Sequence, residues 1–358
     1  MKKQSTIKRV LIVEDSLTVR QYLGYIIGSD PQLEVVGMAR DGEEGVKLAR
    51  RKRPDVITMD IHMPKMDGYE ATRRIMEECA VPIVVVTSSW NSANVRNSFR
   101  AIEAGALMAL EKPPGPGHPK SATLAAKLVR TLKAMSEVRV VTRLSYLKKR
   151  ESGAGVLPAA KTPVLPKKVD LVVMGASTGG PPVLKDILSR LGGDFSAPIL
   201  IVQHMAQGFI EGMVEWLDKE CGLSIKVASD GEFIEKGIVY FAPDGCHMGV
   251  TMTRRIALRD GPAENGVRPS VSYLFRSLAD TYGPGTVGVL LTGMGKDGAL
   301  ELARMKEKGA VTIAQNKESC VVYGMPAEAV KRNGAVHVLS PEGITAFLNS
   351  INNPKGNP

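Results

Sequence analysis

Short apolar runs alternate with amphipathic helical segments along this chain, and the alternation occurs twice. Runs rich in Val, Ile and Leu that lead into helical periodicity are typical of parallel strands covered by helices on both faces. They predict strands over Arg9–Val13, Leu33–Ala39, Val56–Met59, Ile83–Thr87 and Leu107–Glu111, then over Leu171–Met174, Pro198–Val202, Ile238–Phe241 and Thr286–Leu291, with a hairpin within His247–Arg259. We therefore expect an α/β protein with an N-terminal (βα)5, flavodoxin-like domain. A C-terminal doubly wound, mostly parallel sheet with an antiparallel hairpin follows it.

The composition changes between the two halves. Residues 151–168 hold repeated Gly and Pro residues and paired lysines, a composition that buries little surface and is typical of an exposed linker. A chain of 358 residues is long enough for two domains that each bury a core. We predict a first domain over residues 8–135, a linker over 136–168 and a second domain over 169–351.

Composition also bounds location and partners. No apolar run approaches the roughly 18 residues that span a bilayer, so we expect a cytoplasmic protein without membrane insertion. The four cysteines are scattered without a CxxC pattern, and we expect neither a disulfide framework nor a structural metal. The net charge of +10 admits a nucleic-acid partner, but the basic runs lack interleaved aromatic residues. Solvated basic faces are the preferred interpretation, and no nucleic-acid partner is expected.

Carboxylates gather at strand ends in the first half. Glu14 and Asp15 end the first predicted strand, and Asp60 ends the third. Because the carboxyl ends of parallel strands share one edge, three negative charges meet there, and an oxygen-binding divalent cation relieves their repulsion. Thr87 and Lys112 lie at the ends of the fourth and fifth strands. Carboxylates, Mg²⁺, a hydroxyl and an ammonium group can together place a phosphoryl group on one carboxylate.

This set resembles the receiver domain of two-component response regulators. The match rests on Glu14, Asp15, Asp60, Pro64, Asp67-Gly68, Thr87 and Lys112-Pro113. The resemblance implies that Asp60 is the phosphoacceptor and that Thr87 and Lys112 contact the phosphoryl group. It also implies that Mg²⁺ is bound by Glu14, Asp15, Asp60 and the backbone carbonyl of His62. Many receivers carry an aromatic switch residue three positions before the lysine, where this chain has Ala109. How phosphorylation reaches the output is therefore left open.

The second half opens with a strand that ends at a turn of small residues. The turn is Gly175-Ala176-Ser177-Thr178-Gly179-Gly180-Pro181, in which glycines allow close backbone approach and the proline suits the first turn of a helix. Such a turn can bind a phosphate, cap a helix or present Ser177 as a nucleophile. It lacks both the GxGxxG fingerprint and a P-loop lysine, which disfavours the phosphate.

A nucleophilic serine needs a base and an orienting acid. Of the five histidines, His204 ends a buried strand at the same edge as Ser177, whereas His247 follows a turn and His337 fits a core or edge strand. Asp297 is the acid of the glycine-rich turn that follows the strand at Thr286–Leu291. Ser177, His204 and Asp297 thus form a candidate triad, with backbone amides near Thr178 and Met294 as candidate oxyanion donors. Helix capping stays open as the alternative, because serines and aspartates commonly cap helices. The order Ser, His, Asp also differs from that of α/β hydrolases, and GxSxG is absent.

Seven segments of the second half resemble the chemotaxis receptor methylesterase (CheB) family. They are Gly175–Gly180, Gln203–Met205, Tyr240–Pro243, Asp260–Pro262, Arg268–Val271, Leu291–Gly298 and Ser319–Pro326. The resemblance covers nearly all of both domains in the same order. It implies that Ser177, His204 and Asp297 are catalytic, that Thr178 supports the site and that the Met294 amide stabilises the oxyanion. Lys317 stands where related sequences often carry an acid, and its effect on substrate docking stays open.

The resulting hypothesis is a phosphorylation-activated protein-glutamate methylesterase gated by its receiver domain. It would release methanol from glutamate methyl esters on methyl-accepting chemotaxis receptors, and the resemblance adds deamidation of receptor glutamines. Mg²⁺ serves the receiver, the esterase needs no cofactor, and a histidine kinase of the CheA type is the expected phosphodonor. The rival hypotheses are a receiver-controlled DNA-binding regulator and a noncatalytic scaffold that binds receptors. The sequence leaves the receptors, the pathway output and the oligomeric state open.

Overall fold

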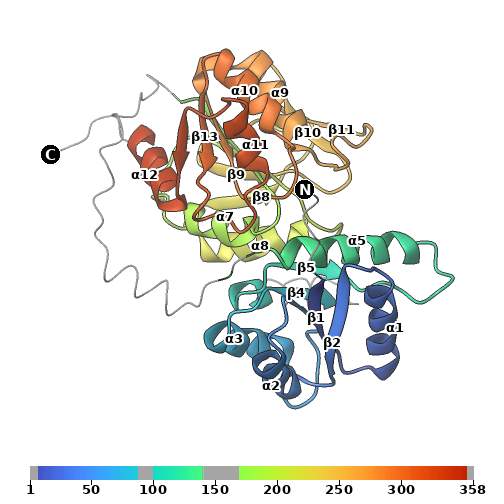
Figure 1. The fold of residues 1–358 in the computed structure, drawn as a ribbon. Coiled ribbons are helices and arrows are strands. Elements are labelled where there is room, and N and C mark those ends of the chain that lie inside the picture. Colours follow the sequence, from blue (N-terminus) through green and yellow to red (C-terminus); the bar gives the residue numbers. More distant parts are fainter. Residues whose placement is uncertain (1–6, 88–99, 139, 141–168, 353–358) are drawn as a thin grey trace. The chain divides into compact units, whose positions relative to one another are not determined.

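The computed structural model describes residues 7–87, 100–138, 140 and 169–352. These residues fall into two compact units, one from each half of the chain, and each is described by itself (Figure 1). Most of the predicted linker, residues 136–168, lies outside the described residues, so the linker and the domain boundaries stay predictions. None of the described helices is both long and apolar enough to cross a membrane.

The first unit is a five-stranded parallel sheet with the order β2-β1-β3-β4-β5. Its elements are β1 (Lys8–Val13), α1 (Leu17–Gly28), β2 (Leu33–Ala39), α2 (Gly42–Lys52), β3 (Val56–Met59), α3 (Gly68–Glu78), β4 (Ile83–Thr87), β5 (Met108–Glu111) and α5 (Ser121–Met135). β3 and β4 are buried throughout, which explains their mostly apolar sequences. The strand order reverses between β1 and β3, and sheets of this kind bind ligands at that switch point.

The second unit contains a seven-stranded parallel sheet with the order β14-β13-β12-β6-β7-β9-β8. Its strands are β6 (Leu171–Ala176), β7 (Ile199–Gln203), β8 (Ser224–Val227), β9 (Ile238–Phe241), β12 (Thr286–Leu290), β13 (Val311–Gln315) and β14 (His337–Leu339). A separate antiparallel hairpin joins β10 (His247–Val250) to β11 (Ile256–Arg259). The predicted fold class is confirmed for both units.

Helices cover both faces of the larger sheet (Figure 1). They are α7 (Gly180–Leu188), α8 (Ile210–Glu220), α9 (Val271–Thr281), α10 (Ala299–Glu307), α11 (Met325–Lys331) and α12 (Pro341–Asn352), with a short 3-10 turn η1 (Gly283–Gly285). α12, α7 and α8 pack on one side, whereas α9, α10 and α11 pack together on the other. The central strands are therefore buried, and functional groups of this sheet collect at its carboxyl edge.

Three strands of the larger sheet lie outside the predicted strand ranges. β13 is fully buried and pairs with β12, while β8 is a short strand with an exposed serine at its start. β14 carries His337 at the sheet edge, which is one of the two positions expected for that histidine. Pairing between strands far apart in sequence creates these elements, and local patterns report such pairing weakly.

Candidate active site and phosphoacceptor site

Three carboxylates of the first unit converge at the switch point. Carboxylate oxygens of Glu14, Asp15 and Asp60 lie within 4.8 Å of one another. The Asp60 amide donates to the Val13 carbonyl at 2.9 Å, which holds the end of β3 beside the end of β1. Glu14 and Asp60 are buried and Asp15 is exposed. The chain thus brings together the acidic residues that the sequence placed on one edge.

Lys112 joins two of these carboxylates. Its Nζ lies 2.7 Å from Glu14 Oε2 and 3.2 Å from Asp60 Oδ2, and its amide donates to the Thr87 carbonyl at 2.9 Å. Burial and the charge of Asp60 raise the pKa of Glu14 to about 7, and burial also raises the pKa of Asp60. Two buried carboxylates share one ammonium group, so an added cation is favourable, and a donor set made of oxygen fits Mg²⁺. His62 lies exposed in the loop that follows β3, two residues after Asp60.

Gly68 packs directly against the backbone of Asp60. A Cβ at this position would lie 2.1 Å from the Asp60 carbonyl oxygen. We expect Gly68→Ala to lower the free energy of unfolding of the first unit by about 1–3 kcal/mol and to slow phosphoryl transfer to Asp60, the phosphoacceptor that the sequence predicts. Urea unfolding and phosphate incorporation from a small phosphodonor measure the two effects. Gly115→Ala is the matched control, because a Cβ there meets nothing within 4 Å. Equal losses in both variants would contradict the prediction.

The three predicted triad residues follow neighbouring strands of the second unit. β6 lies between β12 and β7. Ser177 follows β6, and its amide donates to the Thr292 carbonyl after β12 at 3.0 Å. His204 follows β7, and its amide donates to the Ala176 carbonyl at 2.9 Å. These hydrogen bonds hold the three strand ends side by side.

Glycines allow the close contacts around the Ser177 turn. A Cβ on Gly180 would lie 2.0 Å from Gln203 Oε1, and one on Gly293 would lie 2.7 Å from the Ser177 Cβ. Gly179 has a φ of 76° at the start of α7, in the left-handed region that favours glycine. Protein atoms occupy the space beside Gly180 and Gly293. These packing contacts explain why both positions are glycine, and a bound phosphate is not needed to explain them.

Asp297 is a buried carboxylate with a full set of hydrogen-bond donors. Its Oδ2 lies 2.9 Å from His204 Nε2 and accepts from the Val271 amide at 2.6 Å. Its Oδ1 accepts from Ser270 Oγ at 2.7 Å, Asn265 Nδ2 at 2.9 Å and the Ser272 amide at 3.2 Å. Burial alone would raise the pKa of Asp297. The hydrogen bond and charge of His204, with donation from Ser270 and Val271, outweigh burial and hold that pKa well below its usual range.

The hydrogen bond to Asp297 sets which ring nitrogen of His204 can act as a base. An ionised carboxylate only accepts, so Nε2 carries a proton and Nδ1 keeps its lone pair. No hydrogen bond joins Ser177 Oγ to His204 among the described residues. The structure thus brings His204 and Asp297 into contact and puts Ser177 on the adjoining strand end. Catalytic hydrogen bonds to a nucleophile commonly tighten only when substrate binds.

Asp297 does not cap α10, the helix that follows it, but it does accept hydrogen bonds at the start of another helix. The N-caps of α7 and α10 are Gly179 and Gly298, without side-chain caps. Asp297 instead accepts from the first amides of α9, at Val271 and Ser272. The N-terminus of α9 therefore stabilises the charge of the carboxylate that faces His204.

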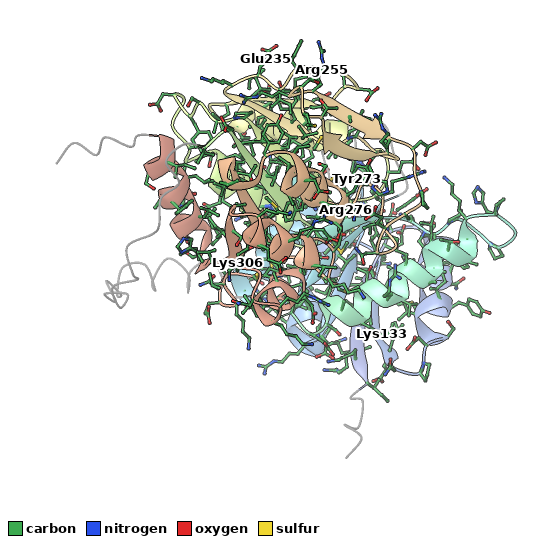
Figure 2. All side chains as sticks on the ribbon, turned by 90° about the horizontal axis from the view of Figure 1, so that it is seen from above. Lys133, Glu235, Arg255, Tyr273, Arg276 and Lys306 are labelled. Atoms are coloured by element: carbon green, nitrogen blue, oxygen red, sulfur yellow. The ribbon has the colours of Figure 1, made fainter. Side chains whose placement is uncertain are left out.

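Sequence reasoning did not identify the residues that support Asp297. Ser270 caps α9 and donates its hydroxyl to Asp297, while its amide donates to His247 Nδ1 at 3.2 Å. His247 Nε2 in turn donates to the Pro262 carbonyl at 2.9 Å. The His247 ring stacks on Tyr273, which is labelled in Figure 2, with 4.9 Å between the ring centroids. His247 is buried and both its ring nitrogens are used, so it supports the site and cannot serve as the base. A serine before an apolar helical run was the available signal for Ser270.

A pocket of about 600 Å³ opens beside the His204–Asp297 pair. Asn265 and Met294 also line it, whereas Ser177 is not among its lining residues. Within the described part of the chain, the Met294 amide donates no hydrogen bond, so it is available to an oxyanion. Thr178 is buried, and its carbonyl accepts from Thr292 Oγ1 at 2.9 Å. The pocket can therefore admit an acyl group next to an imidazole base and a free amide.

Comparisons with known proteins match both halves. Residues 10–122 match the family model for the response regulator receiver domain, and residues 172–348 match the one for CheB methylesterase. A protein-glutamate methylesterase/protein-glutamine glutaminase of Syntrophus aciditrophicus is 54% identical over 95% of this chain and 97% of its own length. One from Geobacter metallireducens is 49% identical over 96% and 98%. The crystal structure of the Thermotoga maritima CheB methylesterase catalytic domain is 38% identical, with a TM-score of 0.50 over 51% of this chain and 99% of that chain.

Proposed function

The chain belongs to the CheB methylesterase family, and on that premise we propose that it is a phosphorylation-activated protein-glutamate methylesterase and protein-glutamine glutaminase that acts on chemoreceptors. One observation carries the catalytic part. The Asp297 carboxylate lies 2.9 Å from His204 Nε2, at the strand end next to the one that bears Ser177. This arrangement leaves His204 Nδ1 free to act as the base for the Ser177 hydroxyl.

In the proposed reaction, Ser177 Oγ attacks the ester carbonyl of a glutamate side chain while His204 Nδ1 takes its proton. The Met294 amide, with the Thr178 amide as the second proposed donor, stabilises the oxyanion that forms. His204 returns the proton to the leaving methanol, and water then resolves the acyl-enzyme to free glutamate. A glutamine side chain follows the same route with ammonia as the leaving group. Asp297 stays ionised throughout and stabilises the imidazolium.

We infer that the first unit controls this reaction as a receiver domain. Asp60 is the proposed phosphoacceptor, and a histidine kinase is the proposed donor. Glu14, Asp15 and Asp60 would hold Mg²⁺ with the His62 carbonyl, and the ion when bound would neutralise charge on the phosphoryl group. Lys112 already lies 3.2 Å from Asp60 Oδ2, close enough to pair with a phosphoryl oxygen, and Thr87 ends the neighbouring strand. Phosphorylation would shift the population of the protein toward its active state.

Methanol release from methylated chemoreceptors tests the proposed function. Membranes with radiolabelled methyl groups are incubated with the protein, with Mg²⁺, and with or without a small phosphodonor. We expect methanol release that the phosphodonor stimulates by a factor on the order of 10. In Asp60→Asn the phosphodonor should no longer change the rate, because the acceptor oxygen is lost.

The possible outcomes separate the two parts of the proposal. Methanol release that is equal with and without the phosphodonor would refute control by the receiver and leave the chemistry standing. Absence of methanol release under both conditions, with a folded protein, would refute the esterase. A fluorophosphonate that labels the wild-type protein but not Ser177→Ala would exclude the noncatalytic scaffold.

A further inference from the structure

Charged side chains form part of the wall of the pocket beside His204 and Asp297. Lys296, Glu328 and Arg332 all line it. Lys296 directly precedes Asp297 in the turn after β12, and Arg332 directly follows α11. Two cations from different elements thus line the same pocket as the proposed base, His204.

The cations of this wall are only partly neutralised from within the protein. Lys296 is exposed and has no ion-pair partner among the described residues. Glu328 lies 3.8 Å from Arg332 and 3.6 Å from Lys331, so its single charge is shared between two cations. Both pairs are long and both cations are exposed, and ion pairs of this kind contribute little. Asp297 keeps its negative charge, but its oxygens are held by His204 and by the first amides of α9. Lys296 is therefore the cation of this wall that is left to pair with a ligand.

We propose that Lys296 and Arg332 form a subsite for acidic side chains that flank the modified glutamate in the substrate protein. This inference rests on the proposed function, because it assigns the pocket to the chain around the ester. The ester itself is neutral and cannot use these cations. A neighbouring carboxylate in the substrate can pair with them while the ester reaches His204 and Ser177. Val267 and the exposed Met294 supply apolar surface for the stem of the same side chain.

Two synthetic peptides test the subsite with the full-length protein. Each carries one glutamyl methyl ester, flanked in one peptide by glutamates and in the other by serines. Methanol release gives kcat/KM for each, and the ratio of the two values is the readout, because it cancels any general loss of activity. We expect wild-type protein to prefer the acidic peptide about 10-fold at low salt and less at high salt, since salt screens exposed charges.

Lys296→Glu and Arg332→Glu should reduce this preference to about 1 or reverse it, and Lys296→Met should give an intermediate ratio. Lys308→Glu is the control, because it makes the same change of charge at an exposed lysine that does not line the pocket. α10 spans nine residues, about 13 Å, between Lys296 and Lys308, and Lys306 in Figure 2 marks its last turn. Lys308→Glu should keep the wild-type ratio.

An unchanged ratio in Lys296→Glu and Arg332→Glu would overturn the subsite, as would equal kcat/KM for both peptides with wild-type protein. A ratio lowered as much by Lys308→Glu would overturn it too, because overall charge would then explain the preference. If wild-type protein hydrolysed neither of the two peptides nor the methylated receptors, the proposed function itself would be refuted.

Discussion

Ser177→Ala is expected to abolish methanol release, with kcat lowered by a factor on the order of 10⁶, the loss seen when a triad nucleophile is removed. Without the hydroxyl no acyl-enzyme can form, and the remaining groups only polarise the carbonyl. The same variant should lose ammonia release from glutamine substrates, because both reactions use one acyl intermediate. Methanol and ammonia assays on the same protein sample measure both losses.

The fold of Ser177→Ala should survive, which makes the loss interpretable. The Ser177 backbone provides the structural hydrogen bonds, through its amide to Thr292 and through its carbonyl from Gln203 Nε2 at 2.9 Å. Alanine keeps both. Ser189→Ala, at the exposed end of α7, is the matched control and should retain activity. If Ser177→Ala unfolds at the same temperature as wild-type protein and still releases methanol, Ser177 is not the nucleophile.

The sequence predicted those features that follow from strand ends in parallel sheets. Buried parallel strands have mostly apolar sequences, so β3 and β9 were predicted with the bounds that the structure has. Because the carboxyl ends of such strands share an edge, Glu14 could be placed beside Asp60 and His204 beside Asp297 without coordinates. Both pairs lie together in the structure.

The support of Asp297 could not be predicted, since it depends on tertiary contacts without a local pattern. Asn265 reaches Asp297 across 32 positions of sequence, and Ser270 across 27. Only the packing of α9 against the turn after β12 brings these donors to the carboxylate. Which ring nitrogen of His204 faces Asp297 likewise depends on the folded structure and has no signal in the local sequence. For the same reason the sequence could name His247 as a candidate base but could not show that both its nitrogens are used.

Asp297→Asn is expected to lower kcat by about 10⁴, through the tautomer of His204. If the new amide group faces His204, it donates to Nε2 and moves the imidazole proton to Nδ1, where the base is needed. In that orientation the NH2 group of the asparagine also faces the Val271 N–H, so that two donors face each other. In the opposite orientation the NH2 group faces the donors of Ser270, Asn265 and Ser272. Either way a buried donor loses its acceptor, so the free energy of unfolding should fall by about 1–3 kcal/mol.

The pH dependence of the free energy of unfolding distinguishes loss of the Asp297 charge from a general disturbance of the fold. The folded protein lowers the pKa of Asp297, so its stabilisation is fully present above the unfolded value of about 3.9. It is lost as the pH falls below that value. The difference in urea midpoint between wild-type protein and Asp297→Asn should therefore be constant near neutral pH and shrink below about pH 4. Asp280→Asn, which removes an exposed partner of Arg304 on the same unit, should change the urea midpoint little and should leave kcat unaltered. A difference for Asp297→Asn that grew toward acid pH would mean that the folded protein raises the pKa of Asp297, which would contradict a carboxylate stabilised by His204 and the start of α9.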